Sequence, residues 1–281
     1  MNELVVKHLF PILDAHLLTL LRSLSAEQWN APTLAKHWTV KDIVAHLLDG
    51  NIRTLSLQRD RFFGVVPPKD IASYQGLVQW LNALNHEWVH AAKRISPEVL
   101  ILLHEVTGTL TSAYYASLNP DDEAVFSVAW AGEGRSVNWM HLAREYTEKW
   151  HHQQQIRHAV GAEAALMTRE LFFPAIDTFM RALPHTYRTV EARAGTLVCV
   201  SVSTDIGGAW WLRSNGTTWQ FDWHVHGEHP PTPDATVTLP PETAWMLVTK
   251  GVSAETARSS ALVKGKSQLV EPVFSMVSVM A

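Results

Sequence analysis

The spacing of hydrophobic residues changes once along this chain of 281 residues, and the change restricts the possible folds more than any other feature of the sequence. Up to about residue 160, apolar residues recur every three or four positions, which is the spacing of one face of an α-helix. Further on they alternate, with Val198, Val200 and Val202 on one side and Cys199 on the other, as in a β-strand with one buried face. The sequence therefore predicts a helical region followed by an α+β region.

Start and stop signals place the helices of the first region. Thr39, followed three residues later by Asp42, is typical of a capping box. Ser96 is expected to cap a helix whose first residue is Pro97. The expected helices span residues 3–24, 40–63, 72–95, 96–118 and 136–161. Long antiparallel helices with connections of mixed length predict a four-helix bundle.

The second region carries the signals of a small sheet. Gly207–Gly208 and Asn215–Gly216 are turn signals between short runs of strand-forming residues. Besides the alternating run, we expect strands over residues 209–213, 218–225 and 235–239 in an antiparallel sheet, and helices over residues 240–249, 255–261 and 271–280. The predicted domains are a bundle over residues 1–165 and an α+β domain over residues 166–281.

The stretch from Ser136 to Gly161 is predicted to form one long helix with a polar face. Ser136 can cap its N-terminus, and Gly161 ends it where a left-handed residue is easiest to place. At about 100° per residue, this face holds His141, Glu145, Glu148, His152 and Gln155. Glu148 and His152 lie one helical turn apart, so both can bind one ion. The alternative is a solvated helix face on which Arg144 pairs with Glu148.

A third candidate ligand, His46, lies on the helix predicted over residues 40–63. Gly50, one turn further on, leaves room for something bulkier than a side chain to approach. Together with Glu148 and His152, His46 makes a set of two imidazoles and one carboxylate without sulfur. This is the ligand set of an open catalytic zinc site, with nickel or ferrous iron as alternatives. For His46 alone, a partly exposed histidine with a hydrogen-bonded edge is the competing interpretation.

Two motifs resemble those of a known family. The segments W-T-V-K-D-I-V-A-H, from Trp38 to His46, and E-K-W-H-H-Q-Q-Q-I-R-H-A-V-G, from Glu148 to Gly161, are similar to motifs of the mycothiol-dependent maleylpyruvate isomerases. That family belongs to the DinB-like four-helix metalloproteins. The resemblance covers nearly the whole chain. It implies that His46, Glu148 and His152 are metal ligands, and that a sterol-carrier-like domain follows the bundle.

The resemblance also concerns two individual residues. Gln155 stands where many members of the family carry an acid before an Ile–Arg pair, so a hydrogen bond to a metal-bound histidine has to be made differently here. The family has an essential arginine in its C-terminal domain. Arg258 is the candidate for this catalytic residue in the present chain.

The only cysteine, Cys199, lies in a valine-rich strand without a neighbouring base, so we expect a core residue and not a nucleophile. Thiol chemistry would therefore need an external low-molecular-weight thiol, which the resemblance identifies as mycothiol. In the family, the thiolate adds to an activated carbon–carbon double bond, and rotation followed by expulsion completes a cis–trans isomerisation. We expect a metal- and thiol-dependent enzyme for a small molecule, either an isomerase of the maleylpyruvate type or a thiol S-transferase. The alternatives are a non-catalytic carrier of an apolar ligand and a hydrolase that uses metal-bound water.

Composition argues against other classes of function. A formal charge of −4 and a pI near 6.4, without clusters of Lys and Arg, argue against a nucleic-acid partner. No apolar run reaches the roughly 18 residues of a membrane span, and a single cysteine is typical of the reducing cytoplasm. Asp222, His224 and His226 alternate along a predicted strand, which is either a second metal site or, as we expect, a polar outer face. The sequence carries no signal for an oligomeric state.

Overall fold

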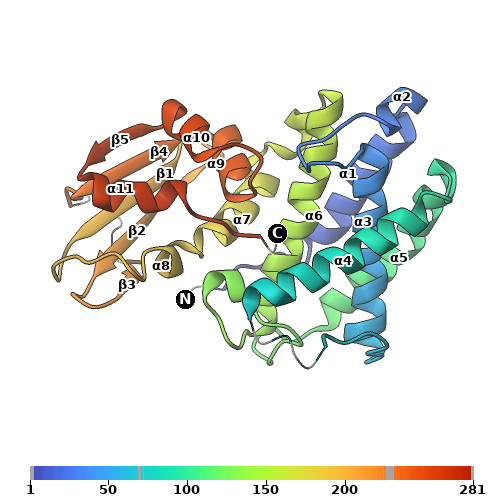
Figure 1. Cartoon of the computed structure of the whole chain (residues 1–281), viewed down its shortest axis with the longest axis horizontal. Helices are drawn as coiled ribbons and strands as arrows, with labels where there is room; N and C mark the ends of the chain where they lie inside the picture. The colour runs from blue at the N-terminus through green and yellow to red at the C-terminus, as the bar shows by residue number, and fades with distance from the viewer. Residues whose placement is uncertain (1–2, 69–70, 72, 224, 226–230, 280–281) are drawn as a thin grey trace. The chain divides into compact units, whose positions relative to one another are not determined.

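The computed structural model describes residues 3–68, 71, 73–223, 225 and 231–279 (Figure 1). The chain divides into two compact units. Unit 1 comprises the chain up to Phe126 together with Val137–Ala165, and unit 2 comprises Ser127–Ser136 together with Leu166–Val279. The domain boundary expected after residue 165 stays a prediction, because unit 2 also contains a segment from much earlier in the chain.

Unit 1 is helical. Its elements are α1 (Leu9–Ser23), α2 (Ala26–Trp29), α3 (Val40–Arg53), the π-helical η1 (Thr54–Arg59), α4 (Tyr74–Ala92), α5 (Pro97–Ser117) and α6 (Asn138–Val160), and the 3₁₀ helix η3 (Glu163–Leu166) leads out of it. Four helices form a closed ring of contacts, in the order α1, α5, α3, α6 and back to α1, while α4 packs against α3. The predicted helical bundle is therefore confirmed, with α4 as a fifth long helix. No helix among the described residues is long and apolar enough to cross a membrane.

Local capping explains where most of these helices begin and end. The Thr39 hydroxyl accepts a hydrogen bond from the backbone N–H of Asp42, whose side chain accepts one from the Thr39 N–H at 2.9 Å, so the predicted capping box is confirmed. Gly161 ends α6 with a φ of 71°, where a residue without a side chain avoids strain.

The predicted cap at Ser136 is wrong. Helix α6 begins at Asn138, and no side chain caps its first turn. The Ser136 hydroxyl instead accepts a hydrogen bond from the N–H of Val128 at 2.9 Å and donates one to Glu133. Its oxygen is thus engaged by the loop before the helix, which the local sequence pattern does not reveal.

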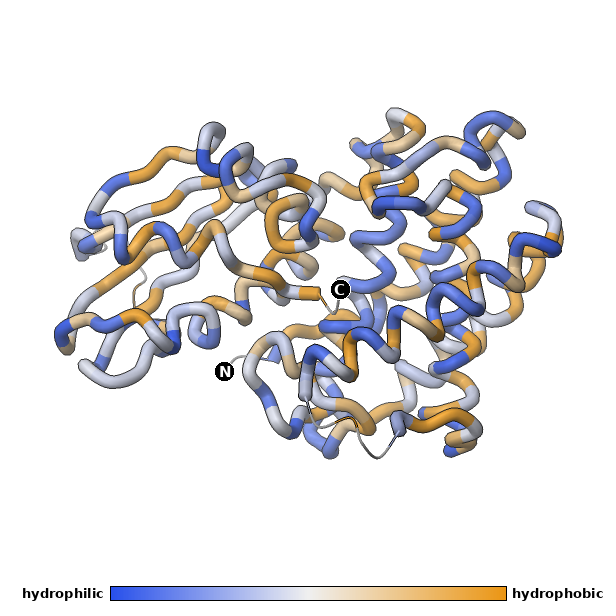
Figure 2. Tube along the Cα trace, in the orientation of Figure 1, coloured by the Kyte–Doolittle hydropathy of each residue, from blue (hydrophilic) through white to orange (hydrophobic). Residues whose placement is uncertain are grey.

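The bundle core lies where the four ring helices meet. Phe10, Leu48, Leu100 and Trp150, one from each helix, have no exposed surface. Burying a side chain of this size stabilises the fold by roughly 1.5–3 kcal/mol. Figure 2 shows the underlying pattern as alternating apolar and polar bands along the helices.

Unit 2 is an α+β structure. Its elements are η2 (Ala129–Ala131), α7 (Arg169–Met180), α8 (Leu183–Thr186), β1 (Leu197–Val202), β2 (Gly208–Ser214), β3 (Trp219–Phe221), β4 (Ala235–Leu239), α9 (Pro241–Val248), α10 (Ala254–Ser260), β5 (Leu262–Gly265) and α11 (Ser267–Phe274). The strands form one sheet in the order β3-β2-β1-β4-β5. Helices α7, α8 and α11 contact strands β2, β3 and β4 respectively. The expected combination of a helical region and an α+β region is confirmed.

The expectation of an antiparallel sheet is wrong at one strand pair. Strand β4 pairs with β1 in parallel, with Val200 opposite Val237, whereas the other three pairs are antiparallel. The turn signals Gly207–Gly208 and Asn215–Gly216 predict the β1–β2 and β2–β3 hairpins, but they carry no information about how β4 pairs. Strands β3 and β4 run in the same direction on opposite sides of the β2–β1 pair. Strand β5, which the sequence did not predict, pairs with β4.

His104 is expected to make the stability of unit 1 depend on pH. Its ring is 4% exposed, Nε2 lies 2.9 Å from the Val44 carbonyl oxygen, and burial lowers its pKa from 6.5 to about 4. Between these pH values the unfolded chain binds a proton that the folded chain does not. The free energy of unfolding should therefore fall as pH decreases through this window, by about 1.4 kcal/mol per pH unit for this one group.

The variant His104→Gln tests this link, because an amide can still donate to Val44 but does not titrate. In urea unfolding between pH 7 and pH 4, we expect its dependence on pH to be smaller than that of the unmodified chain by about one proton. Leu100→Ala is the control, since it should lower stability equally at every pH. Equal slopes for His104→Gln and the unmodified chain would contradict the assignment.

A fragment of residues 1–165 is expected to remain helical and to bind a divalent metal, because α3 and α6 both belong to unit 1. Its segment Ser127–Ser136 should be the first site of limited proteolysis, since the fragment lacks contacts such as that between Gly132 and His185. A fragment that folds without binding metal would indicate that unit 2 supplies a ligand.

Candidate metal centre

Three side chains on α3 and α6 bring possible metal-binding atoms together. His46 of α3, and Glu148 and His152 of α6, each offer one atom, and these atoms all lie within 4.8 Å of one another. In the part of the chain that the structure describes, no other group of three or more histidine, cysteine, aspartate or glutamate residues is gathered in this way. The structure thus brings together the three residues that the sequence singled out.

The pair on α6 is close to the spacing that a metal requires. Nε2 of His152 lies 3.6 Å from a carboxylate oxygen of Glu148, one helical turn away. Two ligand atoms of a tetrahedral zinc lie about 3.3 Å apart, given metal–ligand distances near 2.0 Å. His152 is 9% exposed, whereas the Glu148 side chain is 27% exposed. The pair is therefore buried on the imidazole side and reaches solvent at the carboxylate.

Gln155 fixes the orientation of the His152 ring. Its side-chain oxygen lies 2.9 Å from Nδ1 of His152 and accepts the N–H of that nitrogen. The lone pair is then on Nε2, the nitrogen that lies toward Glu148. In metal sites, the histidine nitrogen that does not bind the metal usually donates such a hydrogen bond, which fixes the orientation of the ring. The acid expected from the family pattern is thus replaced by an amide oxygen in the same role.

His46 completes the group with a buried nitrogen that lacks a partner. Nδ1 of His46 is buried and makes no hydrogen bond, an omission that costs about 1–3 kcal/mol. The ring centroid lies 4.7 Å from that of His152, and the two planes are inclined by 78°. Burial, with a contribution from the charge of His152, lowers the pKa of His46 well below 6.5. The neutral His46 ring can bind a cation. The alternative interpretation was a histidine with a hydrogen-bonded edge, but Nδ1 of His46 has no hydrogen-bond partner.

The charges of the group also suit a divalent cation. Burial alone would raise the pKa of Glu148, but the adjoining rings of His152 and His151 and the positive charge of Arg144 bring it well below 4.5. The neighbouring His151 ring lies against that of His152, with 3.9 Å between centroids and the planes inclined by 37°, and burial lowers the pKa of His151 to about 3. The lowered pKa values keep the His46 and His151 rings neutral and the Glu148 carboxylate ionised near pH 7, an arrangement that attracts a divalent cation. The residues present therefore fit a divalent metal.

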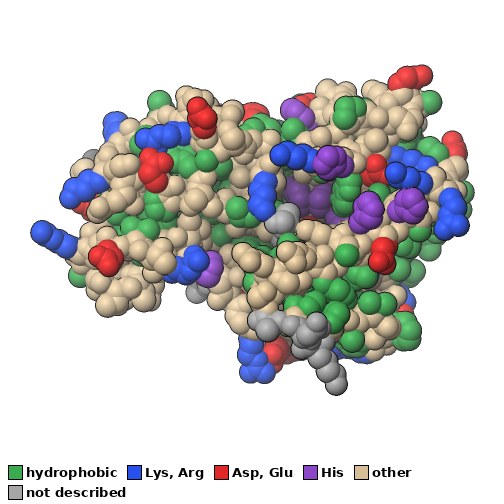
Figure 3. Space-filling view, viewed as in Figure 1, with side chains coloured by type: hydrophobic (Ala, Val, Ile, Leu, Met, Phe, Trp, Pro, Cys, Tyr) green, Lys and Arg blue, Asp and Glu red, His purple; other side chains and the backbone are tan. Residues whose placement is uncertain are grey.

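Contacts to α3 hold His46 in place. The indole N–H of Trp88, on α4, donates to the carbonyl oxygen of Ala45 at 2.7 Å, directly beside His46 in the chain. Nη1 of Arg53 lies 3.4 Å from both Asp49 and Asn85. A side chain at Gly50 would meet no atom within 4 Å, which agrees with the expected free space. Figure 3 shows histidine side chains gathered on the face of unit 1 that is turned toward the viewer, some of them in a hollow.

As the alternative to a metal site, we expected Arg144 to pair with Glu148 on a solvated face of α6, but in the structure Arg144 pairs with a different residue. Arg144 makes its ion pair with the adjacent Glu145, at 2.8 Å, and its Nη2 lies 3.0 Å from Nδ1 of His141. Nε2 of His141 lies 2.8 Å from the side-chain oxygen of Gln58. The polar face of α6 therefore has two parts, one built around His141 and the other around His152.

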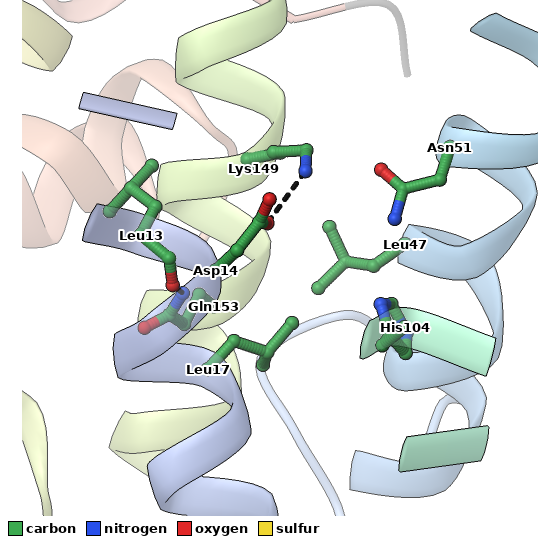
Figure 4. A pocket seen from close by; sticks show the side chains of 8 residues that line it. All are labelled: Leu13, Asp14, Leu17, Leu47, Asn51, His104, Lys149 and Gln153. Atoms are coloured by element: carbon green, nitrogen blue, oxygen red, sulfur yellow. Dashed lines mark hydrogen bonds and ion pairs between the residues drawn. The ribbon is translucent and has the colours of Figure 1, made fainter. Parts of the chain in front are cut away.

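A second polar side of α6 attaches the helix to α1. Lys149 lies 2.7 Å from Asp14, and the amide of Gln153 donates to the carbonyl oxygen of Leu13 at 2.9 Å (Figure 4). One turn further on, Arg157 donates to the carbonyl oxygen of His16 at 3.0 Å. These three contacts follow one another turn by turn along α6 and reach residues 13–16 of α1. They fix how far α6 is shifted along α1, and so where Glu148 and His152 lie in the bundle.

A cavity of about 10 Å³ lies beside these contacts, lined among others by Asp14, Lys149, Gln153 and Asn51. This is about the space of a single water molecule. The side-chain oxygen of Asn51 is buried without a hydrogen-bond partner, so a water here would have polar neighbours.

The other residues singled out by sequence lie in unit 2. Arg258, on α10, pairs with Glu271 at 2.7 Å and its guanidinium lies 5.5 Å from the centre of the Phe274 ring. Its catalytic role stays a prediction. Cys199 is 8% exposed, and burial raises the pKa of its thiol to about 11, as expected for a core residue.

The suggested second metal site is not tested by the structure. His224 and His226 lie outside the described residues. Asp222 is described, and its carboxylate pairs with Arg213 at 2.6 Å.

Comparison with known proteins gives one matching family and two similar solved structures. The model of the family described as the mycothiol maleylpyruvate isomerase N-terminal domain matches residues 10–157. Two crystal structures of mycothiol-dependent maleylpyruvate isomerase, one of them a histidine-to-alanine mutant, resemble the chain with a TM-score of 0.55. They are 13% and, for the mutant, 12% identical to it, and each comparison covers 94% of this chain and 96% of the other. At these identities the likeness shows a shared fold. No curated protein sequence matches the chain.

Gln155→Leu is expected to weaken metal binding by about 10- to 100-fold, because it removes the hydrogen bond that orients His152. Gln155→Glu should retain the affinity, since a carboxylate can accept the same N–H. The measurement is competition for Zn²⁺ or Co²⁺ with a chelator of known affinity. Gln154→Leu, which alters the neighbouring buried amide that bonds Glu163, is the matched control. Unchanged affinity in Gln155→Leu would show that the hydrogen bond has no part in binding.

Lys149→Met is expected to lower the free energy of unfolding by about 3–5 kcal/mol, because Asp14 is then left as a largely buried charge without its ion-pair partner. Adding Asp14→Leu should restore most of this loss. A double-mutant cycle by urea unfolding measures the coupling between the two residues. Strictly additive losses would contradict the view that this pair attaches α6 to α1.

Proposed function

The chain belongs to the mycothiol maleylpyruvate isomerase N-terminal domain family, and from this premise we propose that it is a metal-dependent enzyme acting with an external low-molecular-weight thiol. One observation carries the proposal, namely the convergence of His46, Glu148 and His152 within 4.8 Å. No sulfur ligand takes part, and three protein ligands leave a coordination position for a small molecule.

His46, Glu148 and His152 would hold the divalent cation, with zinc as the simplest choice and nickel or iron as alternatives. Such a cation lowers the pKa of a thiol or a water bound beside it. The chain's own residues keep the site ready. Gln155 holds the proton of His152 on Nδ1, and the low pKa of Glu148 keeps its carboxylate ionised.

The nucleophile is proposed to come from outside the chain. Cys199 is the only cysteine, it lies in unit 2, and its raised pKa leaves little thiolate at neutral pH. Mycothiol is the thiol that the family name implies. The proposed reaction is reversible addition of the thiolate to a carbon–carbon double bond conjugated with a carbonyl group. Rotation about the resulting single bond and loss of the same thiolate give the other isomer, so nothing is oxidised or reduced.

Positive charge near the site favours an anionic substrate such as a maleylpyruvate-type dicarboxylate. Arg53 contributes to lowering the pKa of His46, although burial of that ring is the larger cause, so its charge acts at the site. Its side chain is 40% exposed, and its partner Asp49 has a pKa that burial raises. We propose Arg53 as a cation that meets a carboxylate entering from solvent. Transfer of the thiol to another electrophile, which defines an S-transferase, uses the same groups.

One cavity of unit 2 bears on the carrier alternative. It has a volume of about 310 Å³ and is lined by Cys199, Ser201, Thr236, Thr238, Leu262, Val263 and Lys264. A ligand there would meet both apolar and polar side chains, so ligand retention after removal of the metal is the test of this alternative. A hydrolase using metal-bound water differs from the proposed enzyme in needing no thiol, so thiol dependence separates the two.

The deciding experiment combines elemental analysis with activity assays on the purified full chain. We expect about one divalent metal per chain, and turnover of maleylpyruvate-like substrates only when metal and thiol are both present. His152→Ala should lose stoichiometric metal and activity, whereas Cys199→Ala should keep both. His158→Ala, a histidine of the same helix that pairs with Glu163, is the matched control and should behave like the unmodified chain.

Other outcomes would redirect the assignment. Full metal occupancy in His152→Ala would contradict the ligand set. Turnover without any thiol would indicate the hydrolase. A metal-loaded chain inactive with every thiol and substrate tested would leave the carrier.

A further inference from the structure

Helix α5 has an exposed face with the spacing of a coiled-coil seam. Six exposed residues follow one another at intervals of three and four positions: Val99, Leu102, Val106, Thr109, Ala113 and Ala116. The three larger ones have exposed fractions of 45%, 55% and 53%. Intervals of three and four in alternation are those of the a and d positions of a heptad, which lie on one narrow stripe of a helix.

This face is unusual for a surface in contact with water. The solvent side of a helix in a monomeric protein ordinarily carries charged and polar residues. All of α5 is described, and two of its charged side chains reach solvent: Glu98 at the first turn, and Glu105, which is 38% exposed and already paired with Arg22 of α1. Leu110, beside the seam, is a further exposed apolar side chain at 43%. Apolar side chains thus run along most of the exposed length of α5.

We propose that this face is the interface of a homodimer in which the α5 helices of two copies pack antiparallel about a two-fold axis. The sizes of the residues along the seam support this pairing. The larger side chains occupy the first half of the helix and the smaller ones the second half. In an antiparallel pair that overlaps along the whole of α5, Leu102 lies opposite Ala113 of the second copy, and Val99 lies opposite Ala116. Leu102 and Val99 then each meet an alanine, and Val106 meets Thr109 near the middle of the seam, so the largest side chains face the smallest ones.

The distribution of charge favours the same orientation. A parallel pair would place Glu98 beside Glu98 of the second copy, where like charges repel, and would set large residues against large ones. In the antiparallel pair the two Glu98 side chains are separated by about 28 Å along the helices, from a rise of about 1.5 Å per residue. Each lies at an end of the seam, near Ser117 of the second copy. No unpaired charge is buried, and the two-fold axis makes one surface complementary to itself.

The expected affinity is modest. A single pair of helices lies at or below the roughly 1,200 Å² of total buried surface that marks the lower end of stable interfaces. We therefore expect a dissociation constant in the range of about 1–100 µM. The candidate metal ligands lie on α3 and α6, so the dimer does not depend on the proposed function.

Sedimentation equilibrium of the full chain between about 1 and 200 µM tests the association, a range set by that expected affinity. We expect the mass to rise from 31.5 kDa toward twice that value with concentration. Leu102→Glu should keep the chain monomeric while circular dichroism remains unchanged. The control is Leu262→Glu, which places a charge at a side chain of unit 2 that is 74% exposed and should leave association unchanged. A chain monomeric at every concentration, or a dimer that persists in Leu102→Glu, would overturn the proposal.

Disulfide trapping tests the orientation and does not rely on charged variants. In a Cys199→Ala background, the double variant Leu102→Cys/Ala113→Cys should form an intermolecular disulfide on oxidation. Leu102→Cys alone should not, because its two copies are separated by about 17 Å along the antiparallel pair, far beyond the reach of a disulfide. Cross-linking by Leu102→Cys alone, or by neither variant, would overturn the antiparallel arrangement.

Discussion

The need to satisfy the buried polar side chains of α6 governs the structure of unit 1. This helix passes through the bundle with much of its surface inside, and its buried residues include charged and amide side chains as well as aromatic ones. A buried polar group destabilises the fold unless it has a partner. One side of α6 finds its partners on α1, through Lys149, Gln153 and Arg157. Glu148 and His152, on the other side, are only partly satisfied by protein, as a ligand set requires.

Much of this arrangement could be predicted from the sequence because it is local. The capping box at Thr39, the end of α6 at Gly161 and the E-x-x-x-H spacing depend on residues within one or two turns. Two features that escaped prediction depend on contacts between distant segments. Asp14 and Lys149 are separated by 135 positions, and β4 pairs in parallel with β1, with Val200 opposite the distant Val237. The expected cap at Ser136 failed for a different reason: its hydroxyl bonds Val128 and Glu133, which are nearby in the chain but lie in a loop without a regular pattern.

Gln155 shows how one substitution can leave geometry intact while changing electrostatics. A carboxylate behind His152 would pull on its Nδ1 proton, make the ring a stronger electron donor and add a second negative charge to the site. An amide oxygen makes the same hydrogen bond without that charge. A cation bound here would keep more of its positive charge, and so act as a stronger Lewis acid toward a small ligand.

The segment Ser127–Ser136 has a consequence for the order in which this protein is made. It leads directly into α6, yet it belongs to unit 2, whose main part begins only at Leu166. A ribosome adding about 5–20 residues per second therefore exposes this segment before its partner helix α8 leaves the exit tunnel. The segment reaches its final surroundings late in synthesis. During that interval the contacts of α6 with α1 and α3 have to keep the last helix of the nascent bundle in position, which gives the Asp14–Lys149 pair a part in co-translational folding.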